Sequence, residues 1–323
     1  MARADAFVAL AETTRSGFSE SIHFGALVAL ERDGSIAFSL GDPLVDIYPR
    51  SSTKPMQAIA MVRSGLDLPP DLLALVCASH DGTPGHLDGV RRILASAGLD
   101  ESALRNTPDL PLEEQARERL LNDGGRRSSV QQNCSGKHAG MLATCVINGW
   151  SLDDYIDPVH PLQLVIDDVI PTLTGEPLGH VGIDGCGAPA HVMSLVGLAR
   201  AFRVIAAAPS GSDTAAVATA MSSYPAMVGG DARDITRFMR LVPGMVAKDG
   251  AEAVFAAALP DGRAIALKVS DGNYRACPSI AVEALRLLDI DVTVLAESVR
   301  EPIMGHGREV GEVRVLPDAF GGH

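Results

Sequence analysis

Both ends of the chain carry the apolar pattern of a β-hairpin. Residues 21–30 (SIHFGALVAL) and 35–40 (SIAFSL) flank the turn sequence ERDG, which predicts two antiparallel strands. A second hairpin is predicted within residues 251–273, around the turn sequence PDG, and residues 311–316 (GEVRVL) suit one more short strand. Because strands need hydrogen-bonding partners, we predict that the two ends build one antiparallel sheet.

The middle of the chain instead has the apolar spacing of helices, with a loop at 206–213. We therefore predict an α+β fold in which helices cover the sheet and a largely helical insert lies beside it. All 323 residues form one catalytic unit in this prediction, with an α/β subregion near 20–65 and 210–323 and a mainly helical subregion near 66–209. Helices are expected near 51–65, 71–78, 87–97, 112–121, 137–147, 161–172 and 190–207.

Composition excludes several classes of function. A net charge of −13 argues against nucleic-acid binding, which requires clustered basic residues. No apolar run approaches the roughly 20 residues of a membrane helix, and the first residues lack the apolar core of a signal peptide. Five cysteines, an odd number for this length, suit a reduced chain. We expect a cytoplasmic protein with a small-molecule substrate.

Lysine is scarce in this chain. Of 27 basic residues only Lys54, Lys137, Lys248 and Lys268 are lysines, and the others are arginines. Arginine can replace lysine as a surface charge, but it cannot lose its proton to act as a base. The four lysines are therefore candidates for chemistry.

The stretch RSSTKPMQA places Ser51 three residues before Lys54, at the expected start of a helix. If Ser51 is the N-cap, its hydroxyl and the Lys54 amine lie on one face, and Pro55 falls in the first turn, where it breaks no hydrogen bond. This S-x-x-K spacing is that of penicillin-recognising hydrolases, in which the serine is the nucleophile. The alternative is a capped helix with an ordinary lysine, and S-x-x-K alone is a weak signal.

Lys248 strengthens the catalytic interpretation. It begins a K-x-G triplet before an apolar strand, and S-x-x-K hydrolases carry K-T-G on an edge strand facing the nucleophile. The order hairpin, S-x-x-K helix, helical insert and K-x-G strand also matches theirs. No S-D-N triplet is present, which disfavours a β-lactamase.

Three further stretches carry reactive side chains beside glycines. Ser79 and His80 lie in CASHDGTPGH, where a buried segment meets a loop. Cys134 and Lys137 lie in QQNCSGKHAGM, and Cys186 lies between two glycines in GIDGCGAP. The two cysteines could bind zinc, form a redox pair, or include a nucleophile assisted by the neighbouring His138.

In this order, the segments RSSTKPMQA, CASHDG, NCSGKHAGML and DGCGAP resemble the Rhizobium etli-type L-asparaginases of the asparaginase II family. The resemblance spans most of the chain. It implies hydrolysis of L-asparagine to L-aspartate and ammonia, on a fold related to serine β-lactamases and glutaminases, in a homodimer.

Carried over by position, the resemblance implies two serine–lysine pairs and a zinc site. Substrate-binding polar groups are implied as well. The residues concerned are Ser51, Lys54, Ser79 and Lys248 for catalysis, Arg50, His138 and Asp184 for substrate binding, and Cys134, Lys137 and Cys186 for zinc. From its place beside Ser79, we expect His80 to bind substrate as well.

Two neighbouring amines would help a serine attack an amide, because two ammonium ions resist sharing one desolvated pocket and an uncharged amine can accept a proton. We expect Ser51 to be the nucleophile, since the helix itself places Lys54, while Ser79 attacks instead or relays protons. We expect zinc to orient the substrate rather than generate hydroxide. The alternatives are a glutaminase or another β-lactamase-like amidohydrolase, and a non-catalytic zinc or redox module, which leaves Ser51, Lys54 and Lys248 unexplained.

Overall fold

The sheet built from both chain ends is present in the structure, a computed structural model that describes residues 3–321. Within these residues the main sheet has eight strands, all paired antiparallel, in the order β11-β12-β1-β2-β10-β9-β8, with β3 beside β2. The strands are β1 (Val8–Arg15), β2 (Phe18–Leu30), β3 (Ile36–Leu40), β8 (Val246–Gly250), β9 (Val254–Ala258), β10 (Ala264–Val269), β11 (Glu301–Gly305) and β12 (Arg308–Val315).

The N-terminal and C-terminal halves of the chain meet inside this sheet. β2 pairs with β10, so that Leu27 lies opposite Leu267. β1 lies between β2 and β12 and pairs with both. Both predicted hairpins, β2–β3 and β9–β10, and the predicted strand at 311–316 are confirmed. Strand β1 was not predicted.

Helices follow the predicted pattern through the middle of the chain. The predicted helices correspond to α1 (Lys54–Arg63), α2 (Pro70–Val76), α3 (Pro84–Ser96), α4 (Glu114–Asn122), α5 (Ser135–Asn148), α6 (Pro161–Thr174) and α7 (Leu195–Ala206). The later helices were not predicted: α8 (Asp213–Ser223), α9 (Pro225–Val228), α10 (Asp234–Leu241), α11 (Cys277–Leu287), α12 (Thr293–Ser298) and α13 (Pro317–Phe320). No helix within residues 3–321 is long and apolar enough to span a membrane.

One predicted helix begins later than expected. The pattern at 190–207 becomes helical only at Leu195, because Ser194 is the N-cap and its hydroxyl accepts a hydrogen bond from Gly197 N at 2.9 Å. The residues before it form short strands in two small two-stranded sheets, β4 with β7 and β5 with β6. Their bounds are β4 (Asp46–Ile47), β5 (Val181–Ile183), β6 (Pro189–His191) and β7 (Met193–Ser194).

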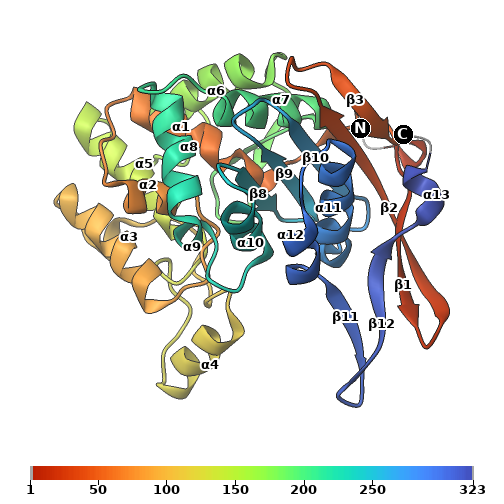
Figure 1. The fold of residues 1–323 in the computed structure, drawn as a ribbon. Helices are drawn as coiled ribbons and strands as arrows, with labels where there is room; N and C mark the ends of the chain where they lie inside the picture. The colour runs from red at the N-terminus through yellow and green to blue at the C-terminus, as the bar shows by residue number, and fades with distance from the viewer. Residues whose placement is uncertain (1–2, 322–323) are drawn as a thin grey trace.

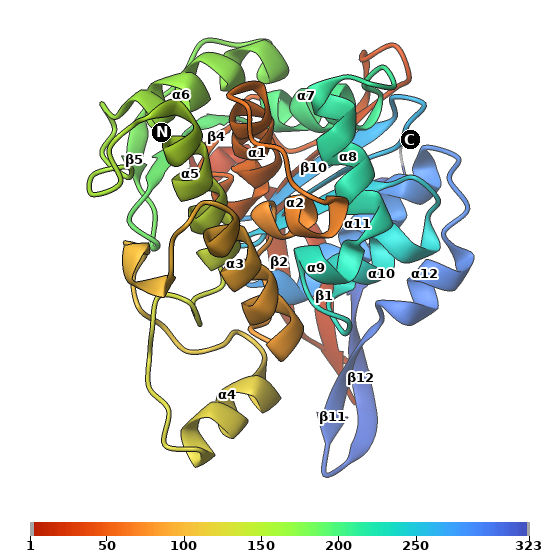
Figure 2. The ribbon, with the colours of Figure 1, turned by 90° about the vertical axis from the view of Figure 1, so that its left-hand side faces the viewer.

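Helices cover the sheet and flank its β8 edge. α7 packs against β2, β9 and β10, while α11 packs against β1, β10 and β12. Helices α7, α8 and α10 contact β8, an edge strand, and helices α1, α2, α3 and α5 gather on the same side of the molecule (Figures 1 and 2). The fold is therefore α+β with helices over an antiparallel sheet, as predicted.

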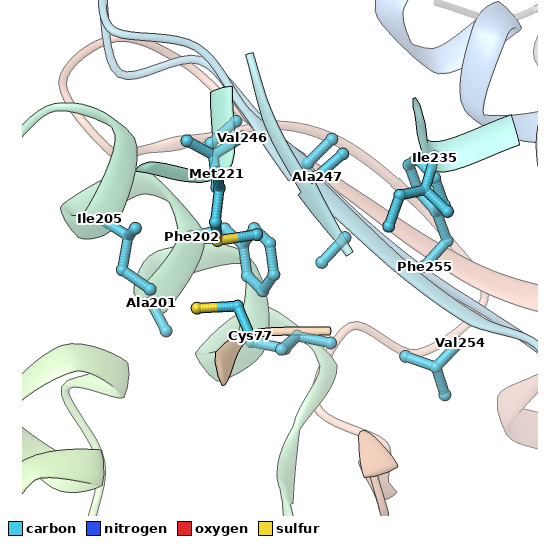
Figure 3. Close-up of a cluster of buried hydrophobic side chains, with 14 of the residues drawn as sticks. Cys77, Ala201, Phe202, Ile205, Met221, Ile235, Val246, Ala247, Val254 and Phe255 are labelled. Atoms are coloured by element: carbon cyan, nitrogen blue, oxygen red, sulfur yellow. The ribbon is translucent and has the colours of Figure 1, made fainter. Parts of the chain in front are cut away.

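Apolar side chains lock β8 against the helices. Phe202 of α7 is fully buried near Met221 of α8, Val246 of β8 and Cys77, which follows α2 (Figure 3). Burial raises the pKa of the Cys77 thiol to about 12, so the thiol stays neutral and packs as an apolar group. Because Cys77 lies two residues before Ser79, this core holds the Ser79 loop beside β8.

We predict that Phe202→Ala lowers the free energy of unfolding by about 3–5 kcal/mol, because it leaves a cavity in the core between α7 and β8. The control is Val204→Ala on the same helix, where the side chain is 37% exposed and the change should stay within about 0.5 kcal/mol. Urea unfolding measures both. Equal losses would contradict a core centred on Phe202.

Candidate active site

Ser51 and Lys54 lie at the start of α1, but Ser51 is not its N-cap. The structure corrects that expectation: Ser51 lies within a 3-10 helix, η2 (Arg50–Thr53), which runs directly into α1. The Lys54 amide bonds to the Ser51 carbonyl, so a tighter turn replaces side-chain capping. Pro55 lies in the first turn of α1, as predicted.

The two expected serine–lysine pairs are connected differently from the prediction. Lys54, almost fully buried, places its Nζ 3.2 Å from Ser79 Oγ and also donates to the carbonyl of Ala78. Within residues 3–321 the hydroxyl of Ser51 has no hydrogen-bond partner. Lys54 therefore contacts the second serine rather than the first.

Lys248 reaches the same serine from the other side. Its Nζ lies 3.0 Å from Ser79 Oγ, donates to the carbonyl of Asp249 at 2.8 Å, and forms an ion pair with the Asp249 carboxylate. Burial lowers the pKa of Lys248 to about 8, against the opposing charge of Asp249 and with the support of the nearby Lys54. One serine hydroxyl thus lies between two lysine amines.

A glycine allows β8 to approach this closely. A Cβ atom at Gly250 would lie 2.2 Å from the carbonyl oxygen of Pro49 and 3.1 Å from Ser52 Oγ. The Ser52 hydroxyl donates to the carbonyl of Lys248 at 3.2 Å, which ties η2 directly to β8. The glycine of the K-x-G triplet is therefore required for the contact between the two catalytic segments.

Sequence reasoning missed an arginine that supports Lys248. Arg233, just before α10, forms an ion pair with Asp249 and donates from Nη1 to Asp81 Oδ1 at 3.4 Å. Although burial opposes it, the charges of Lys248 and Arg233 hold the pKa of Asp249 well below its usual range. Asp81 lies in the quoted CASHDGTPGH stretch and Asp249 is the middle residue of the K-x-G triplet, but nothing in the sequence indicated Arg233.

The predicted metal ligands also come together. Lys137 Nζ donates to Cys186 Sγ at 3.3 Å, and Cys134 and Cys186 pack in one small cluster with Ala188. A hydrogen bond from Cys134 lowers the pKa of Cys186 to about 5, and the same bond raises the pKa of Cys134 to about 12. Although burial opposes it, these sulfurs and Asp184 raise the pKa of Lys137.

All five cysteines are free, which excludes a disulfide between Cys134 and Cys186 in this state. In the described part of the chain, no group of three or more His, Cys, Asp or Glu side chains is placed to hold a metal ion. A metal at this cluster would therefore need the Lys137 amine as a ligand beside the two sulfurs.

Arg50 and Asp184 connect this cluster to the serines. Arg50 donates from Nε to Asp184 Oδ1 at 2.7 Å, and its Nη2 lies 2.6 Å from the same oxygen. Burial opposes ionisation of Asp184, but the charges of Lys137 and Arg50 lower its pKa. A recess of about 10 Å³, with room for about one water, is lined by Arg50, Ser51, Thr53, Lys54, Gln57, Lys137, Asp184, Pro189 and Ala190.

The two candidate histidines are buried and differ in their free hydrogen-bonding atoms. His80 uses both ring nitrogens, accepting from Gly82 N at 3.1 Å and meeting Ser135 Oγ at 2.8 Å. His138 Nδ1 meets the Tyr155 hydroxyl at 2.8 Å, whereas its Nε2 has no partner among residues 3–321. Burial lowers both histidine pKa values well below the usual range, so both rings are neutral.

The model of the L-asparaginase II family matches residues 11–315 of this chain. The chain belongs to the L-asparaginase II family. It is therefore an amidohydrolase, and the matched span includes every candidate catalytic and metal-binding residue described above.

Comparison with curated proteins gives no match. Among solved structures, the chain is similar to a β-lactamase from Mycobacterium bovis, at 16% identity and a TM-score of 0.47, covering 82% of this chain and 95% of that one. It is also similar to Mglu in its tris and glutamate form, at 14% identity and a TM-score of 0.44, covering 88% of this chain and 64% of Mglu. EstCE1, a hydrolase with promiscuous acyltransferase activity, is similar at 12% identity and a TM-score of 0.44, covering 82% of this chain and 93% of that one.

Proposed function

We propose that this chain is an L-asparaginase of the Rhizobium etli type, which hydrolyses L-asparagine to L-aspartate and ammonia with a serine nucleophile. Support comes from the Ser79 hydroxyl between the amines of Lys54 and Lys248, inside a chain of the L-asparaginase II family. An amine that has lost its proton is the base that a serine needs.

Ser51 is the nucleophile in this proposal. Ser51 is partly buried and lines the recess, and no group in residues 3–321 hydrogen-bonds its hydroxyl, whereas Ser79 is buried and hydrogen-bonded to both amines. As Ser51 attacks the side-chain amide carbon, Lys54 takes the hydroxyl proton. That proton passes from Lys54 through Ser79 and the neutral amine of Lys248 to the amide nitrogen, which leaves as ammonia. Water then cleaves the aspartyl ester and regenerates Ser51.

We assign substrate recognition to Arg50 and Asp184 on the recess wall, and to the buried His138, which follows the wall residue Lys137. The Arg50 guanidinium is suited to the substrate α-carboxylate, because a planar guanidinium pairs with two carboxylate oxygens at once. Asp184 offers a carboxylate for the substrate ammonium, and His138 Nε2 provides the free donor of a neutral ring. His80 is left out because both of its nitrogens are engaged within the protein.

We also propose that Cys134, Lys137 and Cys186 bind zinc. The donor set fits, because the two sulfurs already meet and the Lys137 amine contacts one of them. Zinc prefers thiolate and nitrogen ligands, and binding must displace the proton that Lys137 holds. When bound, the metal would supply positive charge beside the recess, which orients a substrate carboxylate.

From the family resemblance we propose a homodimer, and from the free cysteines a cytoplasmic location.

The serine roles predict a clear difference between two variants. Ser51→Ala should lower ammonia release from asparagine by about 1000-fold or more and abolish an aspartyl adduct detectable by mass spectrometry after acid quench. Ser79→Ala should slow turnover yet still form the adduct. Ser64→Ala, at the far end of α1, is the control and should keep full activity.

Loss of the adduct only in Ser79→Ala would make Ser79 the nucleophile. If wild-type protein released ammonia from glutamine but not from asparagine, the alternative glutaminase activity would replace the proposal. Because one methylene changes specificity by only about 1–3 kcal/mol, both substrates belong in the same assay.

The lowered pKa of Lys248 predicts the pH dependence. The neutral amine exists above its pKa, so kcat/KM for asparagine should rise with pH through about 8 and then level off. Asp249→Asn removes a negative charge that stabilises the ammonium, so the midpoint should move to lower pH. A midpoint that moves to higher pH in Asp249→Asn would contradict this assignment.

Metal content tests the zinc proposal independently of activity. Protein prepared with zinc should contain about one zinc per chain by elemental analysis, and Cys186→Ser should lose it because a thiolate ligand is gone. Cys145→Ser, a buried cysteine of α5 outside the cluster, is the matched control and should keep the metal. Equal zinc in both variants would exclude this site.

A further inference from the structure

Of the four lysines, the proposed reaction leaves Lys268 unused. Lys268 lies on β10, half-buried, and its amine donates to the carbonyl of Glu252 and to that of Val269 at 2.6 Å. An ammonium group has three N–H donors, so one remains. Lys268 also lines a cavity of about 590 Å³, well within the size of small-molecule sites.

This cavity, which we name the vestibule, has apolar walls with charges among them. Phe7, Tyr48 and Val192 supply apolar surface, while Arg50, Glu252 and Lys268 supply charges of both signs. The lining rings of Tyr48 and His180 meet edge to face, with centroids 6.4 Å apart, and Asp46 also lines the space. Such walls suit a ligand with an apolar group and charges of both signs.

The vestibule adjoins the catalytic recess. Arg50 lines both spaces, and it pairs with Asp184 where they meet. While that ion pair is formed, the recess has a volume of only about 10 Å³. A substrate that reaches Ser51 must therefore break the ion pair and bind Arg50 in place of Asp184. The α-carbon of the substrate, which carries both the carboxylate and the nitrogen, then lies at the boundary. A residue attached through that nitrogen, whose N–H still faces Asp184, extends into the vestibule.

Vestibule residues also belong to both catalytic segments. Tyr48 and Arg50 lead directly into Ser51, and Glu252 follows Lys248 by four residues in the turn between β8 and β9. That turn holds Glu252 at φ 61° and is fixed by the hydrogen bond from Lys268. Within residues 3–321 no hydrogen bond or ion pair engages the Glu252 carboxylate.

We propose that the enzyme also deamidates asparagine at the C-terminus of a dipeptide, with the first residue bound in the vestibule; this rests on the proposed function. The free α-carboxylate of the asparagine binds Arg50, and the peptide carbonyl accepts the remaining N–H of Lys268. The ammonium of the first residue pairs with Glu252, and an apolar side chain packs on Tyr48 and Phe7.

The chemistry is unchanged on this longer substrate. The bond from the side-chain carbonyl carbon to nitrogen breaks, water supplies the hydroxyl to the carbon, and the nitrogen leaves as ammonia. The product is a dipeptide ending in aspartate. The peptide bond is not cleaved, because it lies in the vestibule, away from both serines.

The experiment compares ammonia release by the full chain from L-asparagine, L-phenylalanyl-L-asparagine and L-asparaginyl-L-phenylalanine. The first dipeptide should be hydrolysed with kcat/KM within about tenfold of asparagine or above it, and mass spectrometry should find intact phenylalanyl-aspartate. The reversed dipeptide, whose asparagine carboxylate is blocked, should be at least about 100-fold poorer. Turnover of asparagine without turnover of phenylalanyl-asparagine overturns this inference alone, whereas no turnover of asparagine overturns the proposed function.

Two variants locate the effect. Val192→Trp fills the vestibule and should raise KM for phenylalanyl-asparagine at least about tenfold, while Val159→Trp, at a position 76% exposed, should not. Glu252→Gln should raise KM for phenylalanyl-asparagine but leave KM for N-acetyl-asparagine unchanged, because N-acetyl-asparagine has no ammonium group. Equal effects of Glu252→Gln on both substrates, or none of Val192→Trp, would exclude the vestibule as the binding site.

Discussion

The site depends on the close approach of two lysines that share one serine hydroxyl. Bringing Lys54 and Lys248 together in a buried place is electrostatically costly, and the ion pair of Lys248 with Asp249 offsets part of that cost. Arg233 in turn neutralises the remaining charge of Asp249 and Asp81. The ion pairs therefore bind three elements, α10, β8 and the Ser79 loop, around a single oxygen atom.

Packing determines whether these ion pairs can form. β8 is an edge strand of the sheet, so one side of it is available to contact η2 rather than another strand. Gly250 has no side chain that would hold β8 and η2 apart, and the core around Phe202 and Cys77 fixes the position of β8 relative to the helices. The chemistry of the site thus depends on apolar contacts that touch neither the serines nor the lysines.

Local patterns predicted most of the fold, and their failures have physical causes. Both hairpins were recognisable because apolar runs flank short turn sequences. β1 (VALAETTR) was missed because its second half is polar, and its pairing with β2 on one side and β12 on the other is visible only in the folded sheet. Ser51 was mistaken for an N-cap because a 3-10 turn and a helix cap begin with similar residues. The family motifs identified the lysines. The contact of Lys54 with Ser79 and the role of Arg233 depend on distant elements, which spacing along a sequence does not reveal.

The central pairing of the sheet has a consequence for biosynthesis. β2 finds its partner β10 only after more than 230 further residues, and β1 waits for β12 at the very end of the chain. Such distant pairings slow folding, since long loops must close first. A ribosome-bound nascent chain therefore exposes an unpaired β2 edge for most of its synthesis, and chaperones that shield strand edges would act on it during that interval.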